Sequence, residues 1–225
     1  MGFSILHSDP CVFIWCHKSY ITFISSHVND LGLFCNSKVE VAMVKAEFLK
    51  YFSIKDLGDI CTILGIEVSC NCTKRIISLS HCQYIINLAQ EYNQLNCNPV
   101  HTPTEMGNRL STRDSPQMPT ELNAMQSIPY QNLVGSLNHL AVMTRPDIMK
   151  AVQTVSQFSS NPGMKHWNAT LCIVKYLCTT KDWVLTLGGK LESKVPRFIA
   201  YSDADHANHA DHGRSISGYA ILNIT

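Results

Sequence analysis

Two short apolar runs lie on either side of a polar pentapeptide near the start of the chain, and they constrain the fold most strongly. Residues 20–24 read YITFI and residues 31–34 read LGLF, with SHVND at 26–30 between them. β-Branched and aromatic residues favour strands, and a short segment with Asn and Asp favours a tight turn. The pattern therefore predicts a β-hairpin whose Asn-Asp turn, Asn29-Asp30, forms an acidic tip.

Composition indicates a globular protein with a nearly balanced charge. The 225 residues are 45% hydrophobic and 16% charged, which is enough to build a core in one large domain or two small ones. The 18 Lys and Arg residues against 17 Asp and Glu residues give a net charge of +1. A stand-alone nucleic-acid binder usually has a basic excess that displaces counterions. A nucleic-acid role must then depend on a local surface or on parts outside this chain.

The ten cysteines are scattered, and four of them (Cys16, Cys35, Cys61 and Cys172) lie inside apolar runs, where a thiol behaves as a small hydrophobe. The first six residues lack the basic start and long apolar core of a signal peptide. No apolar run approaches the ~20 residues that a membrane-spanning helix needs. We therefore expect free thiols, no membrane contact and an intracellular location, in cytoplasm or nucleus, and not secretion.

The first half of the chain alternates strands and helices. Apolar residues recur at helical spacing (Val41, Val44, Phe48, Leu49 and Phe52), which predicts a helix that ends near Tyr51, with Asn36 or Ser37 as its cap. Residues 62–68 and 76–79 predict a second hairpin. Ser80 and Gln83 fit a capping box that opens the next helix.

The second half predicts helices followed by strands. Residues 97–127 are rich in Pro, Thr, Ser and Asn, which predicts a linker or surface excursion without a core of its own. Pro146 lies just inside one helix start, with Thr144 as its cap. Three apolar stripes predict helices here: Leu133, Leu137, Leu140 and Ala141; Ile148, Val152 and Val155; and Trp167, Leu171, Val174 and Leu177. Residues 184–187, 198–201 and 219–224 predict strands. The fold class is therefore α+β.

Several short motifs follow one another in a definite order: DPCVF at 9–13, FSIKDLG at 52–58, LGIE at 64–67, VGSL at 134–137, TRPDI at 144–148, YSDAD at 201–205 and SGY at 217–219. This succession resembles the reverse transcriptase and ribonuclease H region of the copia-type retrotransposon polyprotein, in partial and degenerate form. The resemblance covers nearly the whole chain.

The resemblance implies three parts. Residues 1–79 correspond to a partial reverse-transcriptase palm with its hairpins. Residues 80–190 correspond to the helical thumb and connection, with the Pro-rich linker at 97–127. Residues 197–225 correspond to the opening strands of a ribonuclease H-like sheet.

The predicted hairpin tip is the position where reverse transcriptases have a pair of aspartates. Here the pair is Asn29-Asp30, with His27 at the position of the preceding aromatic residue. Nucleotidyl transfer uses two Mg²⁺ ions about 4 Å apart, and Mg²⁺ prefers charged oxygens. Asn29 offers only a neutral carbonyl oxygen, and the single carboxylate of Asp30 cannot hold two ions. We therefore interpret the pair as the remnant of a catalytic site, with an ordinary turn as the alternative.

A second candidate site is Asp203, which follows the predicted strand 198–201 as the first metal-binding aspartate of a ribonuclease H does. Several titratable residues come close behind it: Asp205, His206, His209, Asp211 and His212. A polar loop between strands is favoured here over a transition-metal site, which needs a defined tetrahedral arrangement. Asp30 and Asp203 are thus the predicted metal-binding positions.

The resemblance implies an RNA-directed DNA polymerase and ribonuclease H, with Mg²⁺ as cofactor and an RNA or DNA primer–template as partner. It also implies an earlier palm strand with another aspartate, nucleotide-binding fingers and further nuclease carboxylates, which we do not find in these residues. We therefore expect a catalytically inactive fragment. The alternatives are a non-catalytic module that binds nucleic acid or protein, and a decayed reading frame without a selected role. Protein partners stay open.

Overall fold

The chain forms two compact units, Met1–Ile60 and Cys61–Thr225. The computed structural model describes residues 2–17, 19–105, 107, 109–189, 198–205, 211–213 and 215–223. The division after Ile60 differs from the boundaries inferred from the resemblance, which remain a prediction about family domains.

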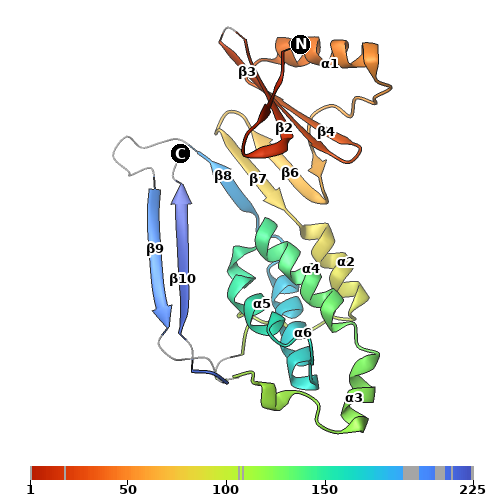
Figure 1. Cartoon of the computed structure of the whole chain (residues 1–225), viewed down its shortest axis with the longest axis vertical. Helices are drawn as coiled ribbons and strands as arrows, with labels where there is room; N and C mark the ends of the chain where they lie inside the picture. Colours follow the sequence, from red (N-terminus) through yellow and green to blue (C-terminus); the bar gives the residue numbers. More distant parts are fainter. Residues whose placement is uncertain are drawn as a thin grey trace. The chain divides into compact units, whose positions relative to one another are not determined.

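The first unit is a four-stranded antiparallel sheet in the order β1-β2-β3-β4, followed by one helix (Figure 1). Its elements are β1 (Ser4–Leu6), β2 (Asp9–His17), β3 (Tyr20–His27), β4 (Asp30–Cys35) and α1 (Lys38–Tyr51). The predicted hairpin and helix are both confirmed, and the Ser37 hydroxyl caps α1 by accepting from the amide of Glu40 at 3.4 Å. Strand β1 was not predicted.

One face of this sheet is buried and the other is open. Along β3, Thr22 and Ile24 are buried, whereas the alternate residues Ile21 and Phe23 are 46% and 38% exposed. Helix α1 contacts β4 and buries Val44. The predicted apolar stripe of α1 continues to Phe52, but Phe52 has extended backbone at the helix C-cap and is exposed. The first unit therefore has a thin core.

The second unit contains another four-stranded antiparallel sheet, in the order β5-β6-β7-β8. Its strands are β5 (Thr62–Ile63), β6 (Ile66–Asn71), β7 (Ile76–Ser80) and β8 (Leu185–Gly188). The prediction of one strand over 62–68 is wrong, because Leu64 and Gly65 have φ values of 52° and 80°. Two successive residues with positive φ form a tight primed turn, so the segment folds back on itself.

The second unit also contains the helices α2 (Cys82–Glu91), α3 (Pro119–Gln126), α4 (Tyr130–Met143), α5 (Met149–Ser156) and α6 (Met164–Thr179), with the short 3₁₀ helices η1 (Thr112–Asp114) and η2 (Pro146–Ile148). In the described part of the chain, none of these helices combines the length and apolarity that crossing a bilayer requires. Two of these helices, α3 and the 3₁₀ helix η1, lie within residues 97–127, the segment that was predicted to be a linker or surface excursion.

The predicted capping box at the start of α2 is wrong. The Ser80 hydroxyl accepts from the amide of Cys82 at 3.0 Å, two residues on. The Gln83 side chain donates to Asn87 at 2.8 Å along the helix and does not reach back to the cap. Instead, the carboxylate of Glu67 on β6 accepts from the amide of Gln83 at 3.0 Å. A long-range partner has replaced the local one.

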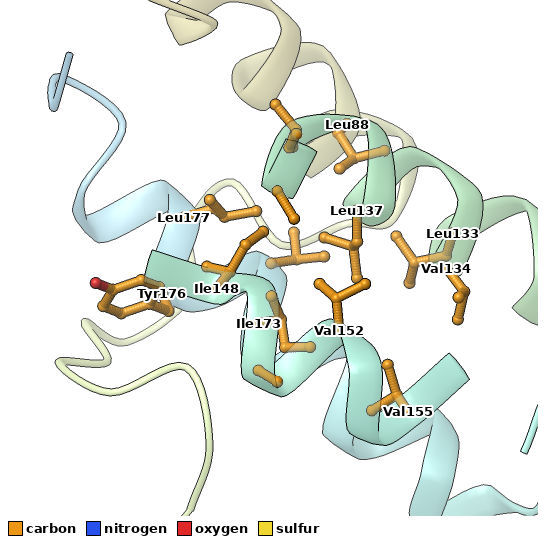
Figure 2. Close-up of a cluster of buried hydrophobic side chains, with 14 of the residues drawn as sticks. Leu88, Leu133, Val134, Leu137, Ile148, Val152, Val155, Ile173, Tyr176 and Leu177 are labelled. Atoms are coloured by element: carbon orange, nitrogen blue, oxygen red, sulfur yellow. The ribbon is translucent and has the colours of Figure 1, made fainter. Parts of the chain in front are cut away.

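The core of the second unit is an apolar cluster between α2, α4, α5 and α6 (Figure 2). The predicted stripe of α4 is confirmed, since Leu133, Leu137, Leu140 and Ala141 are all buried. The predicted stripe of α6 is confirmed in part: Val174 and Leu177 are fully buried, as is Ile173 beside them, whereas Trp167 and Leu171 only pack partly against the cluster. Each buried Leu, Ile or Val contributes about 1.5–3 kcal/mol, so this cluster is the main stabilising feature of the unit.

A separate two-stranded antiparallel ribbon consists of β9 (Phe198–Asp205) and β10 (Ile216–Asn223). Its register places Phe198 opposite Asn223 and Asp205 opposite Ile216. Both strands are longer than predicted, and Ile224 of the predicted second strand lies outside the described residues.

His166 is a buried polar residue in the first turn of α6. Its Nδ1 accepts from the Gly163 amide at 2.9 Å, and its Nε2 lies 3.1 Å from the carbonyl oxygen of Ser111. Its ring stacks on Phe158 at 4.0 Å. An acceptor at Nδ1 requires the proton on Nε2, so the ring is neutral in this arrangement. Burial lowers the pKa of His166 and outweighs the opposing effects of Ser111 and Asp114.

Gly163 is required beside this histidine. A Cβ atom at position 163 would collide with the carbonyl oxygen of Asp114. The 3₁₀ helix η1 and the start of α6 therefore approach each other more closely than a side chain would allow.

We predict that Leu137→Ala lowers the free energy of unfolding of the second unit by about 3 kcal/mol, because it removes a fully buried side chain and leaves a cavity. Val142→Ala on the same helix serves as the control, since Val142 is 63% exposed, and its effect should stay within about 0.5 kcal/mol. Urea unfolding of both variants measures this. Equal effects would contradict the assignment of Leu137 to the core.

We also predict that acid destabilises the second unit through His166. The unfolded chain takes up a proton below pH ~6.5, but the folded chain does so only at lower pH because the pKa of His166 is lowered. Stability from this residue is therefore fully present above that pH and is lost as the pH falls. Unfolding free energies at pH 5 to 8 should depend less on pH in His166→Phe than in the unmodified protein, whereas His101→Phe, at an exposed site, should leave the dependence unchanged.

Candidate active site

Asn29 and Asp30 lie where β3 turns into β4. His27 pairs with Asp30, so the two turn residues are Val28 and Asn29, and Asp30 is the first residue of β4. The predicted Asn-Asp turn is thus wrong by one position. Val28 has a φ of 53°, which is strained for a β-branched residue, and its side chain is 87% exposed. The position of the turn is set by the pairing of the strands on either side.

The exposed hairpin tip presents one carboxylate, from Asp30, and one amide, from Asn29. Among the residues that the structure describes, no three His, Cys, Asp or Glu side chains gather where they would hold a metal ion. Two Mg²⁺ ions require several charged oxygens between them. The described side chains at this tip therefore do not fit the pair of Mg²⁺ ions that polymerisation uses.

Asp203 lies within β9, opposite Gly218 of β10, and is exposed. The expectation that it follows the end of a strand is wrong, because β9 continues to Asp205. The reason is its antiparallel pairing with β10, which extends beyond the apolar residues that signalled the strand. Among the described residues, Asp203 belongs to no group of three His, Cys, Asp or Glu side chains that could hold a metal ion.

The titratable segment behind Asp203 is described only in part. His206 and His209 lie outside the described residues, and so does the side chain of Asp205. The Asp211 carboxylate accepts from the Ser111 hydroxyl at 2.6 Å and from the Thr112 amide at 3.0 Å. Asp211 therefore binds the start of η1 in this structure.

The β3–β4 hairpin lies in a segment that resembles a known protein family. Residues 6–106 match the family model described as reverse transcriptase (RNA-dependent DNA polymerase), and this match includes Asn29 and Asp30. The chain is also 36% identical over 215 residues, or 95% of its length, to the retrovirus-related Pol polyprotein from transposon TNT 1-94 of Nicotiana tabacum. The chain contains part of a copia-type reverse transcriptase region.

Two Arabidopsis thaliana relatives support the same conclusion. The Pol polyproteins from transposons RE2 and RE1 are 30% and 31% identical, each over 98% of this chain. The chain spans 16% of the tobacco polyprotein and 14% of each Arabidopsis polyprotein, so it corresponds to less than a fifth of these relatives. No solved structure matches it significantly.

Beyond the residues matched to the reverse transcriptase model, a polar network surrounds Arg145. This buried guanidinium donates to both carboxylate oxygens of Asp147, at 2.9 and 2.7 Å, and to the backbone carbonyl of Thr180 at 3.1 Å. It also lies 5.6 Å from the ring centres of Tyr176 and Trp183. The network connects η2 to the end of α6.

The electrostatics of this network indicate a structural role. Burial acts to raise the pKa of Asp147, but hydrogen bonds from Arg145 and from the Tyr176 hydroxyl (2.9 Å) outweigh it, so the pKa is lowered overall. Both charged groups have their partners inside the protein. In the sequence, TRPDI indicated a helix start and was one motif of the resemblance, but no ion pair was predicted there. The available signal was an Arg and an Asp on either side of Pro146.

Thr144 does not have its predicted role either. Pro146 lies in the first turn of η2 as expected, but the N-cap of η2 is Arg145 and no side chain caps it. The Thr144 hydroxyl instead lies 2.7 Å from Nδ1 of His81, which is buried beside His139. Burial lowers the pKa of His81, and the nearby His139 lowers it further. Thr144 thus connects the end of α4 to the start of α2.

We predict that Arg145→Met lowers the free energy of unfolding by about 3 kcal/mol, because Asp147 and the Thr180 carbonyl lose a buried partner. Lys181→Met is the matched control: its ion pair with Asp182, at 3.2 Å, lies at the surface and should contribute less than about 1 kcal/mol. Urea denaturation of the two variants measures the difference. A loss no larger than that of the control would show that the network is dispensable.

Proposed function

We propose that this chain is a fragment of a copia-type RNA-directed DNA polymerase and ribonuclease H that does not catalyse polymerisation as it stands. The observation that carries the proposal is Asn29, which lies in the matched reverse transcriptase segment at the tip of the β3–β4 hairpin. In this proposal, polymerisation and cleavage on a primer–template require a longer polyprotein, since the chain spans less than a fifth of the relatives it matches.

The same proposal assigns the parts of the chain. Residues 1–79 form part of the palm, residues 80–190 the thumb and connection, and residues 197–225 the start of a ribonuclease H-like sheet. Support comes from the hairpin in the first part, from the helices α2 to α6 in the second, and from the β9–β10 ribbon with Asp203 in the third. We also propose that the protein acts inside the cell, as the cysteine pattern favours.

The physical reason for inactivity is the charge at the hairpin tip. Asp30 and a carboxylate at position 29 would together carry two negative charges next to a metal ion. Asn29 leaves one, and an amide oxygen is a weaker ligand for Mg²⁺ than a carboxylate oxygen. With less negative charge, the hairpin stabilises neither the attacking hydroxyl nor the leaving pyrophosphate through bound metal.

Primer extension tests the proposal. The unmodified chain and Asn29→Asp are incubated with a primer–template, deoxynucleotides and Mg²⁺ or Mn²⁺. We predict no extension by either, because the resemblance implies another palm aspartate and nucleotide-binding fingers that these residues do not supply. Template-dependent synthesis by the unmodified chain would overturn the proposal.

Metal binding at the tip gives a readout besides activity. Mn²⁺ broadens the NMR signals of nearby amides, and the broadening around His27 to Asp30 should require less Mn²⁺ in Asn29→Asp than in the unmodified chain. Asn132→Asp, at an exposed position of α4, adds the same charge in the other unit and should leave the hairpin signals unchanged. If Asn29→Asp binds Mn²⁺ no better than the unmodified hairpin, the missing carboxylate is not the reason for inactivity.

A further inference from the structure

Two cysteines far apart in sequence meet at one backbone carbonyl in the second unit. The carbonyl oxygen of Gln94 accepts from the backbone amide of Cys97 at 3.3 Å and from the Cys178 thiol at 3.8 Å. Cys97 lies in the segment after α2, and Cys178 is near the C-terminal end of α6. Their common partner places the two residues next to each other.

The backbone on both sides of this meeting point is held in place. Asn93 has a φ of 56°, and the Gln94 amide donates to the Ala89 carbonyl at 2.7 Å, which closes the end of α2. Three residues beyond Cys97, the Val100 amide donates to the Thr179 hydroxyl at 3.1 Å. The segment is therefore fixed against α2 at its start and against α6 at its end.

Both thiols are half-buried, so a small reagent can reach them, and neither belongs to the candidate active site. Burial, together with the neighbouring Cys97 thiol, raises the pKa of the Cys178 thiol to about 11. Little Cys178 thiolate exists at neutral pH, so Cys178 is a poor first nucleophile toward a reagent.

We propose that Cys97 and Cys178 form a reversible disulfide bond when the chain meets a low-molecular-weight disulfide. The Cys97 thiolate attacks one sulfur of that disulfide, forms a mixed disulfide and releases one thiolate. The Cys178 thiolate then attacks the Cys97 sulfur and releases the second. The two cysteine thiols are oxidised, the small disulfide is reduced to two thiols, and the two cysteine protons pass through solvent to the released thiolates.

The bond joins the end of the α2 segment to α6 across a loop that contains α3, α4 and α5. Closing so long a loop restricts the unfolded chain strongly. The oxidised second unit should consequently unfold at a temperature about 10 °C higher than the reduced unit.

The experiment uses the full chain in buffers of reduced and oxidised glutathione. Remaining thiols are alkylated, and peptides are analysed by mass spectrometry without reduction. We expect a cross-linked pair of peptides that contains Cys97 and Cys178, formed at a lower share of oxidised glutathione than any other pairing and lost on addition of dithiothreitol. The thermal midpoint should rise with the fraction cross-linked.

Matched variants separate this bond from general oxidation. Cys97→Ser and Cys178→Ser should each abolish both the cross-link and the rise in thermal midpoint. Cys172→Ser, on the same helix, should keep both. The side chains that influence the pKa of Cys172 are those of Glu105 and Lys175, and neither can form a disulfide bond. In Cys178→Ser, glutathione should remain attached to Cys97.

The direct analysis of the unmodified chain does not depend on whether the variants fold. Persistence of a glutathione adduct on Cys97 in the unmodified chain, without transfer to Cys178, would overturn the proposal. Preferential pairing of either residue with a different cysteine would overturn it as well.

Discussion

Burial of one apolar cluster between α2, α4, α5 and α6 is the interaction on which the second unit depends. Leu137 of α4 and Leu177 of α6 have no exposed surface, and Ile85 of α2 and Val152 of α5 are buried in the same cluster, so the four helices share one apolar core. The first unit has nothing equivalent: Ile24 and Val44 are the main apolar side chains buried there. The candidate catalytic hairpin thus belongs to the unit with the thinner core.

Buried polar groups then fix the geometry around the helical cluster. Arg145 contacts Asp147 and Thr180, His166 contacts Gly163 and Ser111, and His81 contacts Thr144. Burying a charge or an imidazole without hydrogen-bond partners costs free energy. Each of these groups therefore favours only those helix arrangements that place a hydrogen-bond partner next to it. The apolar cluster supplies stability, and the polar groups select how the helices connect.

Sequence patterns predicted helices and caps correctly where residues within one or two helical turns determine the local structure. The period of α4 marked its buried face, and Ser37 marked the start of α1, because both depend on residues within a turn or two. The capping box at Ser80 and the cap at Thr144 were wrong for the opposite reason. In each case a distant side chain, Glu67 or His81, offers the hydrogen bond instead.

The sequence by itself determined the family, the α+β class and the chemistry at position 29, because residue identities and their order along the chain decide these. Only the tertiary structure decided that Val28 and Asn29 form the turn, that β8 joins β7, and that Cys97 lies beside Cys178. The position of the turn depends on the register between β3 and β4. The other two features are contacts between segments about a hundred residues apart in the sequence. Long-range pairings of this kind leave no periodic signal in a single sequence, since many partners are locally compatible with each segment.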